Sequence, residues 1–191
     1  MKPVGIFGGT FDPVHNGHLI AAQSVLELRN LEKIIFIPCY ISPHKQDIVS
    51  SSAAHRIEIL NLATGDNPNY EISDYEIKKK SVSYTVDTVE ELKKIYDKIE
   101  LIIGYDNLIT FDKWYESDKL LELCSVVVMK RSTDLLIDLK HKYFEMVEYV
   151  DTPTIEISSR EIRDRVKRNL TISNLVPDKV KEYISLNKLY K

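Results

Sequence analysis

The stretch PVGIFGGTFDPVHNGHL, residues 3–19, decides the fold of this chain. Residues 3–7 form a short apolar run that predicts a buried strand, and Gly8 and Gly9 after it predict a turn. From about His18 to Leu28, apolar residues recur at helical spacing. A buried strand that passes through a glycine turn into a helix is typical of α/β domains built on a parallel sheet.

Strands and helices are predicted to alternate along the rest of the chain. Buried strands are expected at 34–37, 101–103 and 126–129, a half-exposed strand at 70–77 and a weaker strand at 146–150. Helices are expected at 53–63 and 178–186, from Ser158 or Ser159 to about Arg168, and from Thr85 or Thr88, where Thr88 and Glu91 have capping-box spacing. We therefore expect one domain over residues 1–191, a doubly wound, mostly parallel α/β sheet with helices on both faces.

Composition narrows the class of protein. The 191 residues are 43% hydrophobic and carry a formal net charge of −3, so we expect an ordinary core and no broad binding of nucleic acid. We expect no signal peptide, because Gly8, Gly9 and Asp12 interrupt the apolar start, and no apolar run approaches the roughly 20 residues that span a bilayer. The two cysteines lie in apolar runs and indicate buried thiols in a reducing, cytoplasmic setting. Whether the chain forms a homo-oligomer stays open.

The glycine turn carries residues suited to phosphate. Glycines let backbone approach a ligand closely, and a following helix offers free N–H groups and the positive end of its dipole. His15 and His18 add side-chain donors, so the turn is predicted to cradle phosphates, although it matches neither the Walker pattern nor the dinucleotide fingerprint. A zinc site is the alternative for the two histidines, but only His44 and His55 lie in a nearby polar segment as further ligands.

These residues resemble a known family. HNGH at 15–18 resembles the His-x-Gly-His signature of the nucleotidyltransferase superfamily, and GGTFDPVHNGH at 8–18 is similar to the nicotinate-nucleotide adenylyltransferase family. Later blocks resemble the same family: SPHK at 42–45, SYTVDT at 83–88, IGYD at 103–106 followed by Lys113-Trp114, and ISSREIR at 157–163. Arg160 departs from the family, which usually has threonine or another small residue there.

The resemblance implies a Rossmann-like nucleotidyltransferase fold and adenylyl transfer from ATP to nicotinate mononucleotide, with Mg²⁺ held mainly by phosphates rather than by protein ligands. It implies a catalytic set of His18, His15, Lys45 and Arg163. The implied ATP-binding set is Gly8, Gly9, Thr10, Phe11, His15, His18, Gly104, Asp106, Ile157, Ser158, Ser159 and Arg163. The implied mononucleotide-binding set is Lys45, Tyr84, Thr85, Asp106 and Trp114, with the indole stacking on the nicotinate ring.

Three other readings of the motifs compete with this one. A different member of the superfamily, such as phosphopantetheine adenylyltransferase or a cytidylyltransferase, is disfavoured by Trp114 and the Tyr84-Thr85 segment. A fragment of a class I aminoacyl-tRNA synthetase shares a similar adenylate signature, but the short, acidic chain argues against it. A non-catalytic nucleotide sensor is disfavoured because all the charged residues of the motifs are present.

Overall fold

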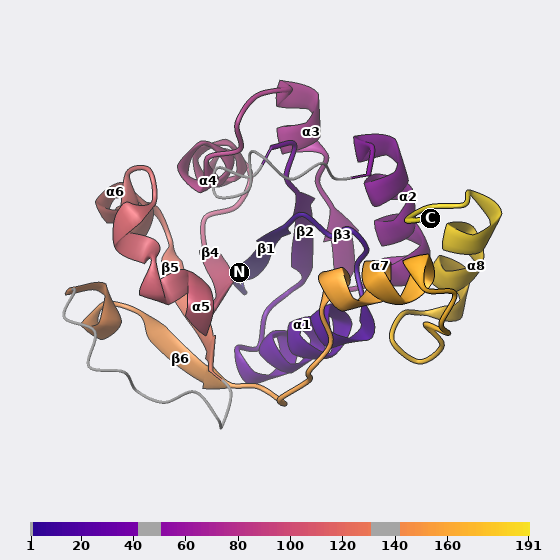
Figure 1. The fold of residues 1–191 in the computed structure, drawn as a ribbon. Helices are drawn as coiled ribbons and strands as arrows, with labels where there is room; N and C mark the ends of the chain where they lie inside the picture. Colours follow the sequence, from indigo (N-terminus) through magenta and orange to yellow (C-terminus); the bar gives the residue numbers. More distant parts are fainter. Residues whose placement is uncertain (1, 42–50, 131–141) are drawn as a thin grey trace.

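The computed structural model describes residues 2–41, 51–130 and 142–191. Its centre is a six-stranded sheet in the order β3-β2-β1-β4-β5-β6, in which every neighbouring pair is parallel (Figure 1). The strands are β1 Val4–Gly9, β2 Ile34–Pro38, β3 Tyr70–Ile72, β4 Ile99–Gly104, β5 Ser125–Lys130 and β6 Glu148–Asp151. Strand order reverses between β1 and β4, which makes the carboxyl ends of these two strands the expected ligand position.

The helices connect successive strands or follow the last one. They are α1 Asn16–Leu28, α2 Ala53–Thr64, α3 Tyr75–Lys79, α4 Thr85–Lys93, α5 Tyr105–Ile109, α6 Ser117–Leu123, α7 Ser159–Lys167 and α8 Asp178–Leu186. Two short 3₁₀ helices, η1 Phe111–Lys113 and η2 Lys142–Glu145, complete the described elements. The doubly wound parallel architecture predicted from the sequence is confirmed.

Helices cover both faces of the sheet, and two hydrophobic clusters result. Alternate residues of β2 divide between them: Ile34 and Phe36 join the cluster under α1, α2, α7 and α8, while Ile35 and Ile37 join the cluster under α4 and α6. All four side chains are at most 1% exposed. Burial on both faces explains why this strand reads as a continuous apolar run instead of an alternating one.

One local prediction is wrong, and one pair of alternatives is decided by the structure. The strand expected at 70–77 stops at Ile72, and the chain turns into the short helix α3. The alternation was misleading because Glu76, which reads as solvent-facing, is buried on this helix. Of the two helix starts that the sequence offers, Thr85 is confirmed, because α4 begins there, and the capping role of Thr88 is wrong, because its hydroxyl donates to the Glu76 carboxylate at 2.7 Å.

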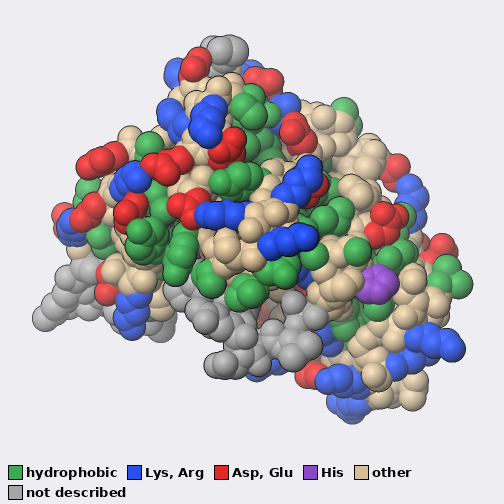
Figure 2. Space-filling view, turned by 90° about the horizontal axis from the view of Figure 1, so that it is seen from above, with side chains coloured by type: hydrophobic (Ala, Val, Ile, Leu, Met, Phe, Trp, Pro, Cys, Tyr) green, Lys and Arg blue, Asp and Glu red, His purple; other side chains and the backbone are tan. Residues whose placement is uncertain are grey.

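The surface carries charges of both signs. On the face seen in Figure 2, basic and acidic side chains are interspersed, as expected for a chain with a net charge of −3. None of the described helices is long and apolar enough to cross a membrane. Both cysteines are buried free thiols, as predicted.

Candidate active site

Two adjoining cavities open at the carboxyl ends of β1 and β4, where the strand order reverses. We call the first the tryptophan cavity; it measures about 470 Å³ and is lined by Glu76, Ser83, Tyr84, Thr85, Thr88 and Trp114. The second, the histidine cavity, measures about 620 Å³ and is lined by His15, His18, Asp106, Ser158, Ser159 and Arg163. Gly8, Gly9, Thr10 and Gly104 line both. Each is large enough for a small-molecule ligand, and the two meet at the glycine turn.

The glycine turn presents bare backbone to both cavities. A Cβ built on Gly8 would meet no described atom within 4 Å, so the space above this backbone is open to a ligand. Gly9 has a different reason to be glycine, because a Cβ there would lie 3.0 Å from the ring of Phe11. That ring is 2% exposed, and its residue adopts a φ of 50° in the left-handed region. The Phe11 side chain therefore packs beneath the turn and stabilises it, and little of the ring faces the cavity.

His15 and His18 form a reciprocal cap at the start of α1. The backbone N–H of His18 donates to Nδ1 of His15, and the backbone N–H of His15 donates to Nδ1 of His18, both at 3.3 Å. The two imidazoles stack with their centroids 3.6 Å apart. Phe11 packs edge-on against His18 at 5.2 Å. Backbone donors and aromatic neighbours thus fix the orientation of both rings before any ligand arrives.

These hydrogen bonds also fix the tautomers. Because Nδ1 of each ring accepts a hydrogen bond, the ring proton of each neutral imidazole sits on Nε2. Burial lowers the pKa of His15 to about 4, so this ring is neutral at physiological pH. Both histidines are consequently Nε2–H donors, and both line the histidine cavity. The phosphate-binding role that the sequence predicts for these two side chains stays a prediction.

A buried arginine that the sequence analysis missed holds the turn in place. Arg56 of α2 is 2% exposed. Its guanidinium donates to the carbonyl oxygens of Thr10 at 2.9 Å, Cys39 at 2.7 Å and Ser51 at 3.2 Å. It therefore ties the segment after β1 to the segment after β2 and to the start of α2. Nothing in the local sequence separates this arginine from an exposed helical one.

Asp12 is a second support. Its carboxylate, 4% exposed, accepts hydrogen bonds from the phenol of Tyr190 at 2.7 Å and from the backbone N–H of Ser51 at 3.1 Å. Burial, together with the charge of Asp12, raises the pKa of Tyr190, so the phenol remains the proton donor. The last residues of the chain are thereby attached to the glycine turn, a contact that spans 178 positions of sequence.

The start of α7 is attached to the same turn. Ser158 caps the helix by accepting from the backbone N–H of Glu161 at 3.1 Å, as its position in the sequence predicted. Ser159 donates to the carbonyl of Pro13 at 2.8 Å, and Arg163 donates to the carbonyl of Asp12 at 2.7 Å. Ile157 and the exposed Arg160 also line the histidine cavity, so the unusual arginine lies at the cavity rim.

The tryptophan cavity has an aromatic wall and a helix start. Trp114 is half-buried and packs on Phe111, with ring centroids 5.2 Å apart. Tyr84 packs against Tyr115 at 4.7 Å. Tyr84 is also the N-cap of α4, and within the described part of the chain no side chain at this cap hydrogen-bonds the first turn. Tyr84 and Thr85 both line this cavity, so the start of α4 lies in its wall.

The structure brings together most residues of the predicted site, with two qualifications. Lys45 lies outside the described residues, as does the rest of the SPHK segment at 42–45. The resemblance implies that Asp106 contacts both ligands, but of the two cavities it lines the histidine cavity and not the tryptophan cavity. Among residues 2–41, 51–130 and 142–191, no cluster of three His, Cys, Asp or Glu side chains could hold a metal ion.

The fold and the site define a class of protein, and comparison with known families agrees. Residues 6–165 match the family model described as cytidylyltransferase-like, so the chain belongs to that family of nucleotidyltransferases. Within it, the chain belongs to the nicotinate-nucleotide adenylyltransferases: it is 41% identical to the enzyme of that name from Bacillus subtilis over 193 residues, which covers 100% of both chains.

Solved structures agree with the fold. The chain is similar to Plasmodium falciparum nicotinic acid mononucleotide adenylyltransferase complexed with NaAD, with a TM-score of 0.80 and 17% identity over 100% of this chain and 98% of that one. The same Plasmodium protein complexed with APC gives a TM-score of 0.78 at 17% identity, with the same coverage. At this level of identity the likeness supports the architecture alone.

Proposed function

We propose that this enzyme transfers the AMP part of ATP to nicotinate mononucleotide, giving deamido-NAD and pyrophosphate, a step of NAD biosynthesis. The observation that carries the proposal is the pair of adjoining cavities at the switch point of the sheet. One offers imidazole and guanidinium donors, and the other offers an indole beside an uncapped helix start. A reaction that joins two nucleotides through phosphate needs both kinds of site, side by side.

The histidine cavity is the ATP half of the proposal. The Nε2–H groups of His15 and His18 and the backbone of the glycine turn would receive triphosphate oxygens, while the fork of Arg163 would hold the outgoing phosphates. Asp106, on the first turn of α5, would accept from a ribose hydroxyl, with Gly104 allowing the ribose to approach. Ile157 and Ser158 would border the adenine. Phe11 and Ser159 would contribute indirectly, by holding the glycine turn in the conformation that binds ATP.

The tryptophan cavity is the mononucleotide half. The indole of Trp114 would stack on the electron-poor nicotinate ring. The backbone N–H groups around Tyr84 and Thr85, at the positive end of α4, would receive the nicotinate carboxylate. Such a site favours the acid over the amide, because an amide brings no negative charge to the helix start.

The chemistry follows from this placement. A phosphate oxygen of the mononucleotide attacks the α-phosphorus of ATP, a new P–O bond forms, and the bond to the β-phosphate oxygen breaks to release pyrophosphate. The nucleophile is already an anion, so the protein has no need to activate one. Its work is to hold two repelling anions in line and to stabilise the charge that develops on the leaving group, which fixed N–H donors do.

Mg²⁺ and Lys45 complete the proposal. Mg²⁺ on the triphosphate would shield its charge and would be held mainly by phosphate oxygens and water. Lys45 would contact the phosphates at the reacting centre. We further propose a cytoplasmic enzyme, in keeping with two free cysteines.

A coupled pyrophosphate assay with ATP and Mg²⁺ tests the proposal. Nicotinate mononucleotide should support turnover, and nicotinamide mononucleotide should support it at least about tenfold less well, the cost of losing one charged contact of roughly 1.4 kcal/mol. Phosphopantetheine serves as the comparison for the neighbouring activity. Pyrophosphate release with phosphopantetheine and none with either mononucleotide would reassign the second cavity, and ATP binding without turnover of any substrate would indicate a nucleotide sensor.

A further inference from the structure

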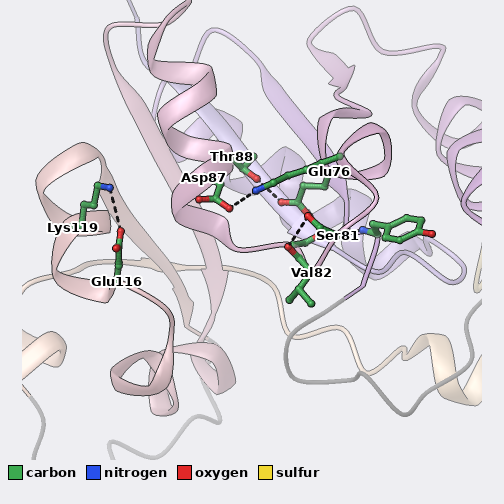
Figure 3. A network of polar contacts seen from close by, with 10 residues as sticks. Glu76, Ser81, Val82, Asp87, Thr88, Glu116 and Lys119 are labelled. Atoms are coloured by element: carbon green, nitrogen blue, oxygen red, sulfur yellow. Dashed lines mark hydrogen bonds and ion pairs between the residues drawn. The ribbon is translucent and has the colours of Figure 1, made fainter.

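Three buried polar side chains form a network in the wall of the tryptophan cavity. Glu76 is 8% exposed, Ser83 is 7% exposed and Thr88 is 2% exposed. Oγ1 of Thr88 donates to Oε1 of Glu76 at 2.7 Å (Figure 3). The hydroxyl of Ser83, which lines the same cavity, acts on this carboxylate to lower its pKa. A carboxylate is costly to bury, and the hydrogen bond from Thr88 offsets part of that cost.

The network joins segments that are separate in the chain. The backbone N–H of Tyr40, beyond the end of β2, donates to Oγ of Ser83 at 3.0 Å. The backbone N–H of Ser83 in turn donates to the carbonyl of Ile41 at 3.0 Å. Because the Ser83 hydroxyl accepts from Tyr40, its own proton is left for a further acceptor, and the Glu76 carboxylate lines the same cavity. Glu76 connects α3 to α4 through Thr88, and Ser83 connects the start of α4 to the segment that follows β2.

The hydroxyls of Ser83 and Thr88 lie on either side of the helix start. Ser83 directly precedes Tyr84, the N-cap of α4, and Thr88 lies one turn after it on the helix. Since the side chain of the N-cap, Tyr84, makes no capping hydrogen bond, the direction in which the first N–H groups of α4 point depends on how the backbone is held from outside. Glu76 holds the helix at Thr88, and Ser83 is held by the backbone of residues 40–41.

We propose that Glu76 is a positioning residue, which through Ser83 and Thr88 aims the first N–H groups of α4 at the carboxylate of the mononucleotide and so sets the preference for acid over amide. The inference rests on the proposed function. Glu76 makes no contact with the reacting phosphates in this proposal. Replacing Glu76 should therefore affect the mononucleotide and not ATP.

Other charges near Glu76 stay in place when its own charge is removed. Lys79 of α3 forms an ion pair with Asp87 of α4 beside the network, and both remain in a Glu76→Gln variant. Burial raises the pKa of Glu76, whereas the hydroxyls of Thr88 and Ser83 and the charge of Lys79 act in the opposite direction. The isosteric amide removes the charge and replaces one acceptor oxygen by an NH2 donor, so the charge-assisted hydrogen bond from Thr88 is weakened and a donor takes the place of an acceptor in the cavity wall.

Steady-state kinetics of Glu76→Gln, with each substrate varied in turn, test the inference. The KM for nicotinate mononucleotide should rise about tenfold, the KM for ATP should stay within about twofold, and the ratio of kcat/KM for acid over amide should fall about tenfold. Thr88→Val should reproduce this pattern because it removes the hydroxyl that bonds Glu76. Thr88→Ser keeps a hydroxyl and should therefore show wild-type values.

Glu100→Gln is the matched control. Glu100 is 6% exposed and accepts two hydrogen bonds from Arg29, at 2.9 and 3.0 Å, near the start of β4 and away from both cavities. Glu100→Gln should lower the free energy of unfolding and leave the acid-to-amide ratio of kcat/KM unchanged, as expected when a buried carboxylate with a purely structural role is removed.

The outcomes are separable. An unchanged KM and ratio in Glu76→Gln, or a lower KM for the acid, would overturn the positioning role while leaving the proposed function intact. If Glu76→Gln does not fold, the comparison of Thr88→Val with Thr88→Ser tests the positioning role of Glu76 instead. Equal kinetics in these two variants would overturn that role. Failure of the wild-type enzyme to use nicotinate mononucleotide would overturn the proposed function, and this inference with it.

Discussion

Replacing His18 with alanine is expected to lower kcat about a thousandfold while leaving the fold intact. The side chain is held for its role by the backbone N–H of His15 and by the ring of Phe11, and it offers an Nε2–H group to the histidine cavity. Removal of one oriented donor at a developing charge costs about 10² to 10³ in turnover. The upper end applies here because the donor serves two mutually repelling anions.

Steady-state kinetics and circular dichroism of His18→Ala check this expectation. His55→Ala is the matched control, since His55 lies on α2, contacts the phenol of Tyr183 at 2.9 Å and is not part of the lining of either cavity. The control should turn over normally. Near-normal turnover of a well-folded His18→Ala enzyme would remove the histidine pair from the mechanism.

Replacing Arg56 with methionine is expected to lower the free energy of unfolding by about 3 kcal/mol. The substitution keeps an unbranched side chain in α2 but deprives the carbonyls of Thr10, Cys39 and Ser51 of a buried donor. Buried acceptors without partners cost about 1–3 kcal/mol each, and partial relaxation reduces their sum. The KM for ATP should also rise, because Thr10 belongs to the glycine turn.

Urea denaturation measures the loss in Arg56→Met. Arg165→Met serves as the control: Arg165 also donates to a backbone carbonyl, that of Thr171 at 2.8 Å, but in an exposed setting. The control should cost less than about 0.5 kcal/mol. A loss below about 1 kcal/mol in Arg56→Met would mean that water or a neighbouring group replaces the guanidinium, and that the turn does not depend on it.

The architecture could be predicted because its signals are local. The run at 34–37 is apolar throughout since Ile34 and Ile35 face opposite covered faces of the sheet. Ser158 caps its helix through a hydrogen bond to a residue three positions on, which sequence spacing reveals. Such signals, repeated along the chain, were enough for the doubly wound sheet and for the position of the glycine turn.

The supports of the site could not be predicted, because they depend on distant contacts. Arg56 and Thr10 are 46 positions apart, and Tyr190 and Asp12 are 178 apart. A single arginine or glutamate in a helical segment has the same local pattern whether it is buried or exposed. Glu76 was therefore read as part of a half-exposed strand. The roles given to Trp114 and Tyr84 came from family resemblance, and their placement in one cavity is what the structure adds.

The central claim is that the glycine turn after β1 binds a triphosphate beside a second anion. A crystal structure of the enzyme with a non-hydrolysable ATP analogue, Mg²⁺ and nicotinate mononucleotide tests this claim most directly. We expect phosphate oxygens within hydrogen-bond distance of Nε2 of His15 and His18, and the pyridine ring against Trp114. Phosphates bound elsewhere, with both imidazole Nε2 atoms hydrogen-bonded to protein instead, would contradict the claim.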